Sequence, residues 1–312
     1  MSRSFAMEIL SAIASSTRGA RFHEDDGPQG ERLFKISEFE RLDVSGPFDV
    51  EIHTGEAASV RASGPERALE NLLVELRDDR LFIGYDKDCD GDVSVSVTVP
   101  HLCALRTSGS GDVSVDRVDA GEFDCSSSGS GDLEIDDIDL TRLQLSSSGS
   151  GDVRIDKLRS TNVELAMMGS GDLLVDALES STFKLIINGS GDALIEDYSG
   201  GQMEATLTGS GDLSVEALEA ASVRLTIFGS GDAHIGEGEA KVATIETSGS
   251  GDVSAERMIV TDANLSVCGS GDISVQVTGR ADILVAGSGD VSVTGGAKCT
   301  LASSGSGEFH CS

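Results

Sequence analysis

Residues 169–188 read GSGDLLVDALESSTFKLIIN, and residues 189–208 read GSGDALIEDYSGGQMEATLT. Both stretches open on Gly-Ser-Gly-Asp and carry apolar residues in the same places, so they are two copies of one 20-residue unit. An internal repeat of this length decides the fold before any other feature. The tetrapeptide begins at Gly109, Gly129, Gly149, Gly169, Gly189, Gly209, Gly229, Gly249 and Gly269, and two further turns follow at 18-residue spacing, at Gly287 and, as Gly-Ser-Gly-Glu, at Gly305.

Apolar side chains within each repeat follow the two-residue period of a β-strand rather than the period of a helix. Counted from the first glycine, positions 5, 7, 10, 15 and 17 are predominantly apolar and predict two or three short strands per unit. A unit with five core residues cannot fold alone, but stacked copies bury a continuous core. The repeat therefore predicts an all-β parallel β-helix, a β-solenoid with about 20 residues per coil. A closed antiparallel barrel gives no reason for identical turns at a fixed period.

The chain divides into three predicted parts. Residues 1–33 are expected to form an N-terminal tail or short helix, with a linker at His23–Arg32. Residues 34–108 read as irregular β coils that cap the solenoid, with one helical turn at Pro65–Glu70 and a degenerate repeat turn at Gly91–Asp92. Residues 109–312 are expected to form the regular GSGD-repeat solenoid.

The composition excludes several function classes. The 312 residues include 54 Asp and Glu against 23 Lys and Arg, so the formal net charge is −31. A field of this sign repels phosphate backbones and anionic lipids, which argues against nucleic-acid binding. No apolar run reaches the roughly 18 residues that a membrane-spanning helix needs. Glu8 interrupts the N-terminal apolar stretch, which is too short for a secretory signal, so we expect no membrane span and a cytoplasmic location.

The cysteines show no pattern of a metal site or a redox motif. In a chain of this size, they do not form a recognisable disulfide framework either. We expect them to be reduced thiols that pack as small apolar side chains. The six are Cys89, Cys103, Cys125, Cys268, Cys299 and Cys311.

One section of the chain resembles a known family. The stretch SGPFDVEI at Ser45–Ile52 is followed by Gly55, the segment Pro65–Leu76, Arg80–Ile83 and the first GSGD strands. Together they resemble the bacterial domain family called putative auto-transporter adhesin, head GIN domain, over about residues 34 to 312. The resemblance implies a right-handed parallel β-helix, an adhesin-like role and a place in the cell envelope. It supplies no catalytic residues.

An acidic residue occupies position 4 of every repeat, so stacking predicts a column of carboxylates about one strand spacing apart. We expect each carboxylate to accept hydrogen bonds from backbone N–H groups of its own turn or the next coil. The alternative is that the column forms a row of Ca²⁺ sites, and Ca²⁺ is the one cofactor that these residues suggest. Calcium-binding repeats, however, have the form G-G-x-G-x-D with two turns per coil. The column comprises Asp112, Asp132, Asp152, Asp172, Asp192, Asp212, Asp232, Asp252, Asp272 and Asp290, and it ends with Glu308.

Two other outward surfaces follow from the repeat. Position 8 is mostly acidic and is expected to form a solvated outer row. Positions 18 and 20 of the second strand are nearly uncharged and mildly apolar, so on an acidic chain they form the surface that repels a partner least. Ordinary sheet surface is the simpler interpretation of this face. Its binding candidates are Met168, Asn188, Thr208 and Phe228.

These features predict a non-catalytic, rod-shaped binding or scaffold protein that acts through its solenoid faces on a protein or glycan partner. Two alternatives stay open: a calcium-dependent cell-envelope adhesin and a polysaccharide-active β-helix enzyme. Glycoside cleavage needs two acids in different environments, whereas these acids sit in equivalent ones. The last repeat, at Gly305–Ser312, is expected to expose strand edges, which predicts either a homodimer through the C-terminal solenoid end or a monomer with a solvated last coil.

Overall fold

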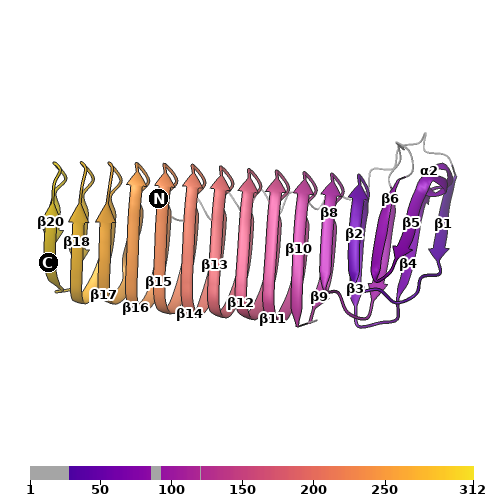
Figure 1. Cartoon of the computed structure of the whole chain (residues 1–312), viewed down its shortest axis with the longest axis horizontal. Coiled ribbons are helices and arrows are strands. Elements are labelled where there is room, and N and C mark those ends of the chain that lie inside the picture. The colour runs from indigo at the N-terminus through magenta and orange to yellow at the C-terminus, as the bar shows by residue number, and fades with distance from the viewer. Residues whose placement is uncertain (1–27, 86–92, 120) are drawn as a thin grey trace. The chain divides into compact units, whose positions relative to one another are not determined.

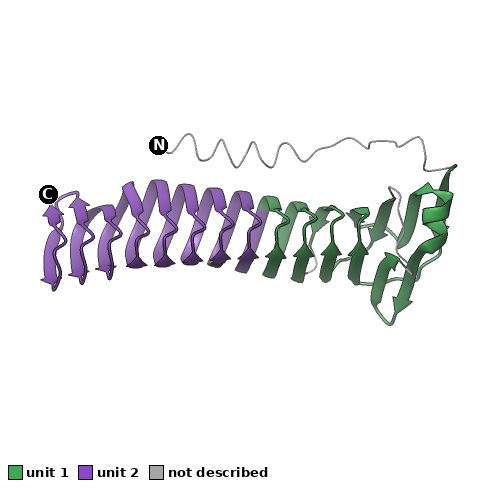
Figure 2. Cartoon of the chain, turned by 90° about the horizontal axis from the view of Figure 1, so that it is seen from above, with its two compact units in different colours: residues 1–157 green, residues 158–312 purple. Residues whose placement is uncertain are grey.

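The structure is a computed structural model that describes residues 28–85, 93–119 and 121–312 (Figure 1). The chain divides into two compact units, Met1–Lys157 and Leu158–Ser312 (Figure 2). The predictions made for residues 1–27, for the turn at Gly91–Asp92 and for Cys89 lie outside the described residues. The chain is nearly all-β, and its parallel coils of about 20 residues confirm the predicted β-solenoid.

In unit 2 each coil pairs in parallel with the next at the period of the repeat (Figure 1). Leu173 is in register with Ala193, and Ala193 with Leu213, so equivalent positions stack directly. The strands that lie wholly in this unit are β13 (Leu173–Gly189), β14 (Ala193–Gly209), β15 (Leu213–Gly229), β16 (Ala233–Gly249), β17 (Val253–Val267), β18 (Ile273–Val285), β19 (Val291–Thr294), β20 (Lys298–Ser303) and β21 (Phe309–Cys311), and β12 (Val153–Gly169) ends here.

A regular coil is one continuous strand of 17 residues, as in β14, and not two or three short strands. The prediction was wrong because the parallel ladder runs on through the bends: Ala177 pairs with Asp197 and Ser180 with Gly200 between the two expected strands. Stacked copies bend at the same positions, so their backbone groups stay paired there.

The core contains all five predicted positions and two more. Positions 5, 7, 10, 15 and 17 are buried, as in Leu213, Val215, Leu218, Val223 and Leu225. Positions 12 and 19 also point inward. Their side chains vary from polar to apolar, and this variation hid them from a search for conserved apolar columns. At position 12 the buried residues include Ser160, Ser180, Ala220 and Val260, and at position 19 they include Ser147, Met167, Ile187 and Thr247.

The turn glycines are required by the close approach of neighbouring coils. Gly209 has φ +122°, and a Cβ added there would overlap the Gly189 carbonyl oxygen. A Cβ at Gly211, two residues on, would overlap the carbonyl oxygen of Gly191. The backbone N–H of Ser210 donates to the Gly189 oxygen at 2.9 Å, so this contact also holds the coils together. Glycine at positions 1 and 3 therefore follows from backbone packing.

Unit 1 combines parallel coils with antiparallel pairs. β2, β8, β10 and β11 pair in parallel, whereas β1–β4, β4–β7 and β5–β6 are antiparallel. The predicted helical turn is observed as α2. The elements are β1 (Gln29–Phe34), β2 (Arg41–Gly46), β3 (Asp49–Thr54), β4 (Ser59–Pro65), α2 (Glu66–Asn71), β5 (Leu72–Arg77), β6 (Arg80–Tyr85), β7 (Ser94–Val99), β8 (Ala104–Gly109), β9 (Val113–Val118), β10 (Glu122–Gly129) and β11 (Leu133–Gly149).

Strand β1 corrects the predicted linker, because residues 29–32 pair with β4 instead of forming a free connection. The side chains that suggested a solvated segment make contacts in the fold. Arg61 forms an ion pair with Glu31 at 2.7 Å, and Arg32 donates to the Leu69 carbonyl oxygen at 3.0 Å. The Arg32 guanidinium also lies 4.5 Å from the ring centre of Phe34.

A disulfide between Cys299 and Cys311 corrects the expectation that all cysteines are reduced. Cys299 is in register with Ala281 and Cys311 with Val293, and both of these neighbours are fully buried. In the last coil, two inward positions are thus bonded to each other, with Cα atoms 6.7 Å apart. The disulfide therefore links β20 to β21. Cys103, Cys125 and Cys268 are free, and burial raises the pKa of Cys125 to about 12.

Candidate functional site

The position-4 aspartates form a hydrogen-bonded ladder in each unit. In unit 2, the Asp232 backbone N–H donates to Asp212 Oδ1 at 2.7 Å, and the Asp212 N–H donates to Asp192 Oδ1 at 2.8 Å. The same bond repeats from Asp192 to Asp172 and onward to Glu308. Asp232 also accepts through its carbonyl oxygen, from the Leu213 N–H at 2.9 Å, and Asp192, Asp212 and Asp252 accept in the same way. The carboxylates therefore accept hydrogen bonds from backbone N–H groups of the next coil, which is one of the two arrangements predicted from the sequence.

Unit 1 contains the same ladder, which starts before the regular repeats. Asp112 donates to Asp49 Oδ1 at 3.0 Å, Asp132 to Asp112 at 2.9 Å and Asp152 to Asp132 at 2.8 Å. Asp49 precedes the first GSGD turn, so the irregular strand β3 already supplies the acceptor that the ladder needs.

Burial raises the pKa of several ladder carboxylates above the usual range. For Asp112, Asp192 and Asp212 the main cause is desolvation, which disfavours the charged form. The backbone hydrogen bond from the next aspartate lowers the pKa, and the neighbouring carboxylates raise it. The ladder thus keeps partly desolvated charges close together and offsets some of the cost with backbone hydrogen bonds.

The ladder does not have the arrangement of a metal centre. Among the described residues, no group of three or more His, Cys, Asp or Glu side chains is placed to hold a metal ion. In Asp112, Asp192, Asp212 and the other acceptors of the ladder bonds, one carboxylate oxygen already accepts a hydrogen bond from the backbone. Calcium binding by this column stays a prediction.

The outer acidic row at position 8 is less uniform than predicted. Glu256 is exposed, as expected of a solvated row. In contrast, Asp176 Oδ1 is buried. Asp136 is exposed, and its pKa is raised first by partial burial and then by the charges of Asp156 and Asp116.

The four binding candidates lie on one exposed surface of unit 2. Asn188 is in register with Thr208, and Thr208 with Phe228. Phe228 is 50% exposed and Met168 is 46% exposed, which is unusual for such large apolar side chains. We call this surface the uncharged face, and it also includes the half-buried position-18 residues. Its members are Ala166, Met168, Ile186, Asn188, Thr206, Thr208, Thr226 and Phe228.

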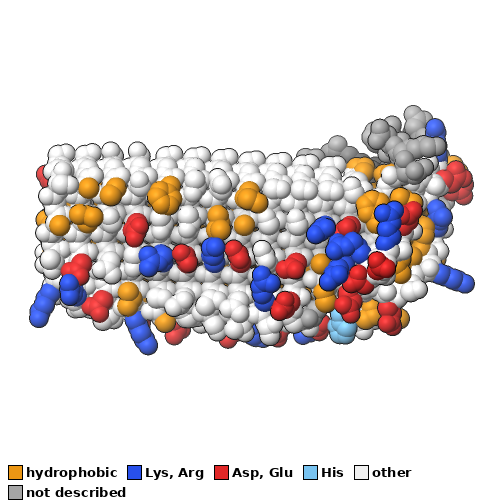
Figure 3. All heavy atoms as spheres, in the orientation of Figure 1, with side chains coloured by type: hydrophobic (Ala, Val, Ile, Leu, Met, Phe, Trp, Pro, Cys, Tyr) orange, Lys and Arg blue, Asp and Glu red, His pale blue; other side chains and the backbone are white. Residues whose placement is uncertain are grey.

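A row of alternating charges borders the uncharged face at position 16. Glu164 is followed by Lys184, Glu204 and Arg224 in successive coils. The Lys184 ammonium lies 3.3 Å from Glu164 Oε1. Figure 3 shows hydrophobic side chains gathered along this surface next to a row of positive and negative ones. The charges in this row offset one another, so the surface is locally close to neutral.

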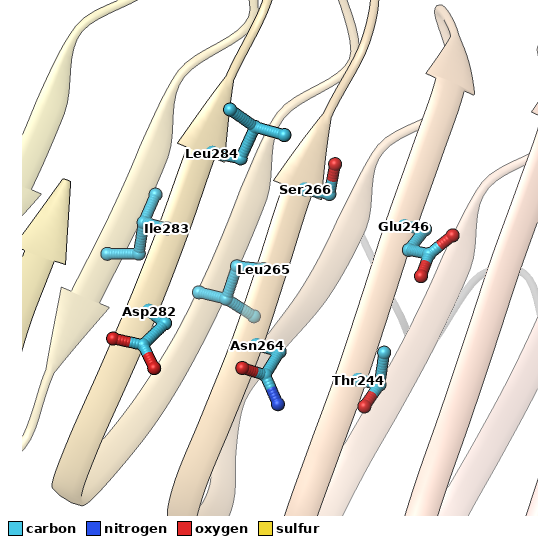
Figure 4. A pocket seen from close by; sticks show the side chains of 8 residues that line it. All are labelled: Thr244, Glu246, Asn264, Leu265, Ser266, Asp282, Ile283 and Leu284. Carbon is cyan, nitrogen blue, oxygen red and sulfur yellow. The ribbon is translucent and has the colours of Figure 1, made fainter. Parts of the chain in front are cut away.

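A shallow groove of about 270 Å³ lies on the same strand surface, beginning on the next coil, β16, and sequence analysis missed it (Figure 4). Counting residues places Leu284 at position 16, but it pairs with Ser266 at position 18, because the spacing shortens to 18 residues after Gly269. A sequence alignment of the last repeats on their strands, rather than on their turns, would have placed Leu284 and Ser266 at equivalent positions. The groove residues are Thr244, Glu246, Asn264, Leu265, Ser266, Asp282, Ile283 and Leu284.

The fold is a β-solenoid built from stacked repeats. The chain belongs to the family described as putative auto-transporter adhesin, head GIN domain, whose model matches residues 38–199 and 194–297. The recognition made from SGPFDVEI and the GSGD turns is thereby confirmed. The family description indicates a cell-envelope or surface location and an adhesin-like role.

Solved structures similar to this chain include three from Parabacteroides species. A putative lipid binding protein from Parabacteroides distasonis is 20% identical, with 92% of this chain and 97% of that chain covered and a TM-score of 0.36. A putative adhesin from the same organism is 15% identical, with 92% and 98% covered and a TM-score of 0.42. A putative adhesin from Parabacteroides merdae is 15% identical, with 92% and 97% covered and a TM-score of 0.37. A search of curated proteins finds no match.

The sequence predicted no membrane-spanning helix, and the helices of the structure can be compared with that prediction. None of the helices in the described residues has the length and apolar character needed to cross a membrane.

Proposed function

We propose that this chain is a non-catalytic, adhesin-like binding protein and that its partner binds the uncharged face of unit 2. The observation that carries the proposal is the exposure of Phe228 and Met168, at 50% and 46%, within a face that has no charged side chain. The whole chain has a formal charge of −31, so a partner approaching elsewhere meets more carboxylates. Exposed apolar patches rimmed by polar residues are typical of interaction sites.

The repeat geometry favours an extended partner over a small enclosed ligand. Asn188, Thr208 and Phe228 follow one another in adjacent coils, about one strand spacing apart. Many weak and similar contacts can therefore add along the stack. Hydroxyl, amide and aromatic groups suit both a glycan and a polypeptide, because all three make contacts that need no charge.

A combined array of glycans and extracellular proteins, probed with labelled full chain, tests this function. We expect wild type to bind members of the array and Phe228→Ser to bind them at least tenfold more weakly. Ile259→Ser is the matched control, because Ile259 is also exposed, at 41%, but lies at position 11, outside the uncharged face. Absence of binding by wild type, or equal loss in both variants, contradicts the proposal. Cleavage of bound glycans supports a polysaccharide-active enzyme instead.

We place the protein in the cell envelope rather than in the cytoplasm, against the inference from the N-terminal sequence. The family description supports this location, and so does the disulfide between Cys299 and Cys311, because disulfides persist mainly in oxidising compartments. Thiol labelling of the native cell before and after reduction tests it. Cys299 and Cys311 should become labelled only after reduction, in the envelope fraction. Labelling before reduction, in the cytosolic fraction, contradicts it.

We also propose a homodimer through the terminal coil. Leu301 is in register with the buried Ile283, yet Leu301 itself is 43% exposed. A second copy packed on this coil would bury the exposed side chain and pair the edge of β20, and a two-fold contact closes without forming a filament. Light scattering should give a dimer for wild type and a monomer for Leu301→Glu. A wild-type monomer at high concentration contradicts the dimer.

A further inference from the structure

The groove on β16, β17 and β18 is a grid of six outward side chains over the strand backbone (Figure 4). One row consists of Thr244, Asn264 and Asp282, which are in register across the three strands. The other row consists of Glu246, Ser266 and Leu284, in the same registers. Between the rows, the groove is floored by the backbone of Leu265 and Ile283, whose side chains are buried in the core.

The charges of the groove are paired at its two edges. At one edge, Arg280 contacts both carboxylate oxygens of Asp282, with Nε 3.0 Å from Oδ1 and Nη2 2.6 Å from Oδ2. At the other edge, the Arg224 guanidinium lies 3.9 Å from Glu246 Oε1. The middle strand contributes the neutral side chains of Asn264 and Ser266. The groove is therefore polar and close to neutral, on a chain that is strongly acidic overall.

One side of the groove is apolar and open. Leu284 is 44% exposed and stands next to Ser266 and diagonally opposite Asn264. A ligand in the groove thus meets hydrogen-bonding groups on one side and a hydrocarbon surface on the other. An amide offers two donors and two acceptor sites, and the hydroxyls of Thr244 and Ser266 act as either.

We propose that this groove binds one ring of a neutral sugar, as a subsite of the partner-binding surface, so the proposal rests on the proposed function. A sugar ring presents adjacent hydroxyl groups, which match the amide of Asn264 and the carboxylate of Asp282. It also presents a C–H face, which packs on Leu284. The volume of about 270 Å³ lies just below the usual range of small-molecule pockets, about 300–1,000 Å³, which suits a single ring.

Electrostatics selects a neutral sugar over an acidic one. Both guanidinium groups near the groove already contact a carboxylate, so an added anion gains little from them and is repelled by Glu246 and Asp282. A polypeptide strand is the less favoured occupant, because the outward side chains of a paired sheet leave its backbone few partners.

Saturation-transfer NMR with methyl glycosides of glucose, galactose and mannose, and with methyl glucuronide, tests the subsite on the full chain. We expect millimolar binding of at least one neutral glycoside, a loss of at least tenfold in Asn264→Ala and in Leu284→Ser, and weaker binding of the glucuronide. Gln202→Ala is the matched control, because it removes an exposed amide at position 14, outside both the groove and the uncharged face, and should leave monosaccharide binding unchanged.

The outcomes separate the subsite from the proposed function. Equal binding by Asn264→Ala and wild type, tight binding of the glucuronide, or no binding of any neutral glycoside overturns the subsite. If Phe228→Ser still abolishes array binding in that case, the binding function stands without the groove. Thermal unfolding of each variant identifies losses caused by misfolding, and Leu284→Ser then serves as the second test of the same subsite.

Discussion

Replacing one ladder aspartate, Asp212, tests the role of the acidic column. Asp212 Oδ1 accepts the Asp232 backbone N–H at 2.7 Å, so Asp212→Ala leaves that donor without its acceptor. A hydrogen bond to a charged group contributes about 1.5–3 kcal/mol. Asp212 is half-buried and Asp232 is exposed, so water compensates for part of the loss. We expect Asp212→Ala to lower the free energy of unfolding by about 1–2 kcal/mol.

Asp212→Asn separates the hydrogen bond from the charge. The amide oxygen can still accept from Asp232, while the desolvated charge between Asp192 and Asp232 is removed. We expect the free energy of unfolding to stay within about 0.5 kcal/mol of wild type or to rise. Urea unfolding followed by far-ultraviolet circular dichroism measures both variants, and Glu256→Ala, an exposed position-8 change, is the control.

Two results would refute the hydrogen-bond account. If Asp212→Asn costs as much as Asp212→Ala, the column acts through charge and not through its acceptors. If Glu256→Ala costs as much as Asp212→Ala, the distinction between the ladder and the outer row is wrong. Because repeat proteins can unfold coil by coil, the unfolding curves are compared only where a single transition fits them.

Three further predictions follow from the same structure. The pKa values of Asp192 and Asp212 are raised, so the folded state binds protons more readily than the unfolded state. The free energy of unfolding should therefore rise as pH falls from neutral toward these pKa values. In melting curves measured at several pH values, the double change of Asp192 and Asp212 to Asn should flatten this rise. Calcium should raise the melting temperature no more than an equal concentration of magnesium, whereas a saturable calcium-specific shift supports a calcium-dependent adhesin. Replacing Cys299 and Cys311 by Ser should lower the free energy of unfolding of the last coil by about 3 kcal/mol. Hydrogen exchange should then show faster exchange of the backbone amides in this coil, and unchanged exchange would contradict a stabilising role of the disulfide.

The sequence predicted what repeats identically. The GSGD turns fixed the period, and the fixed place of Asp after the second glycine predicted a column whose oxygens accept backbone hydrogen bonds. Glycine at positions 1 and 3 follows from the overlap that a Cβ at Gly209 or Gly211 would make with the preceding coil.

Features that depend on contacts between distant segments were not predictable. Strand β1 is identified only by its pairing with β4. The disulfide requires the register of β20 and β21, which the change to 18-residue spacing obscures. Buried Ser180 and Thr247 have polar side chains, so their inward positions carry no apolar signal. The groove combines residues from three coils whose types do not repeat.

Hydroxyl-radical footprinting of the full chain, alone and with the strongest ligand from the array, tests whether the partner covers the uncharged face. Met168 and Phe228 react readily with the radical and are about half exposed in the free chain. We expect ligand to lower the oxidation of both severalfold, while Ile259, at 41% exposed, is oxidised as before. Unchanged oxidation of Met168 and Phe228, with protection elsewhere, would contradict the assignment of the uncharged face as the binding surface.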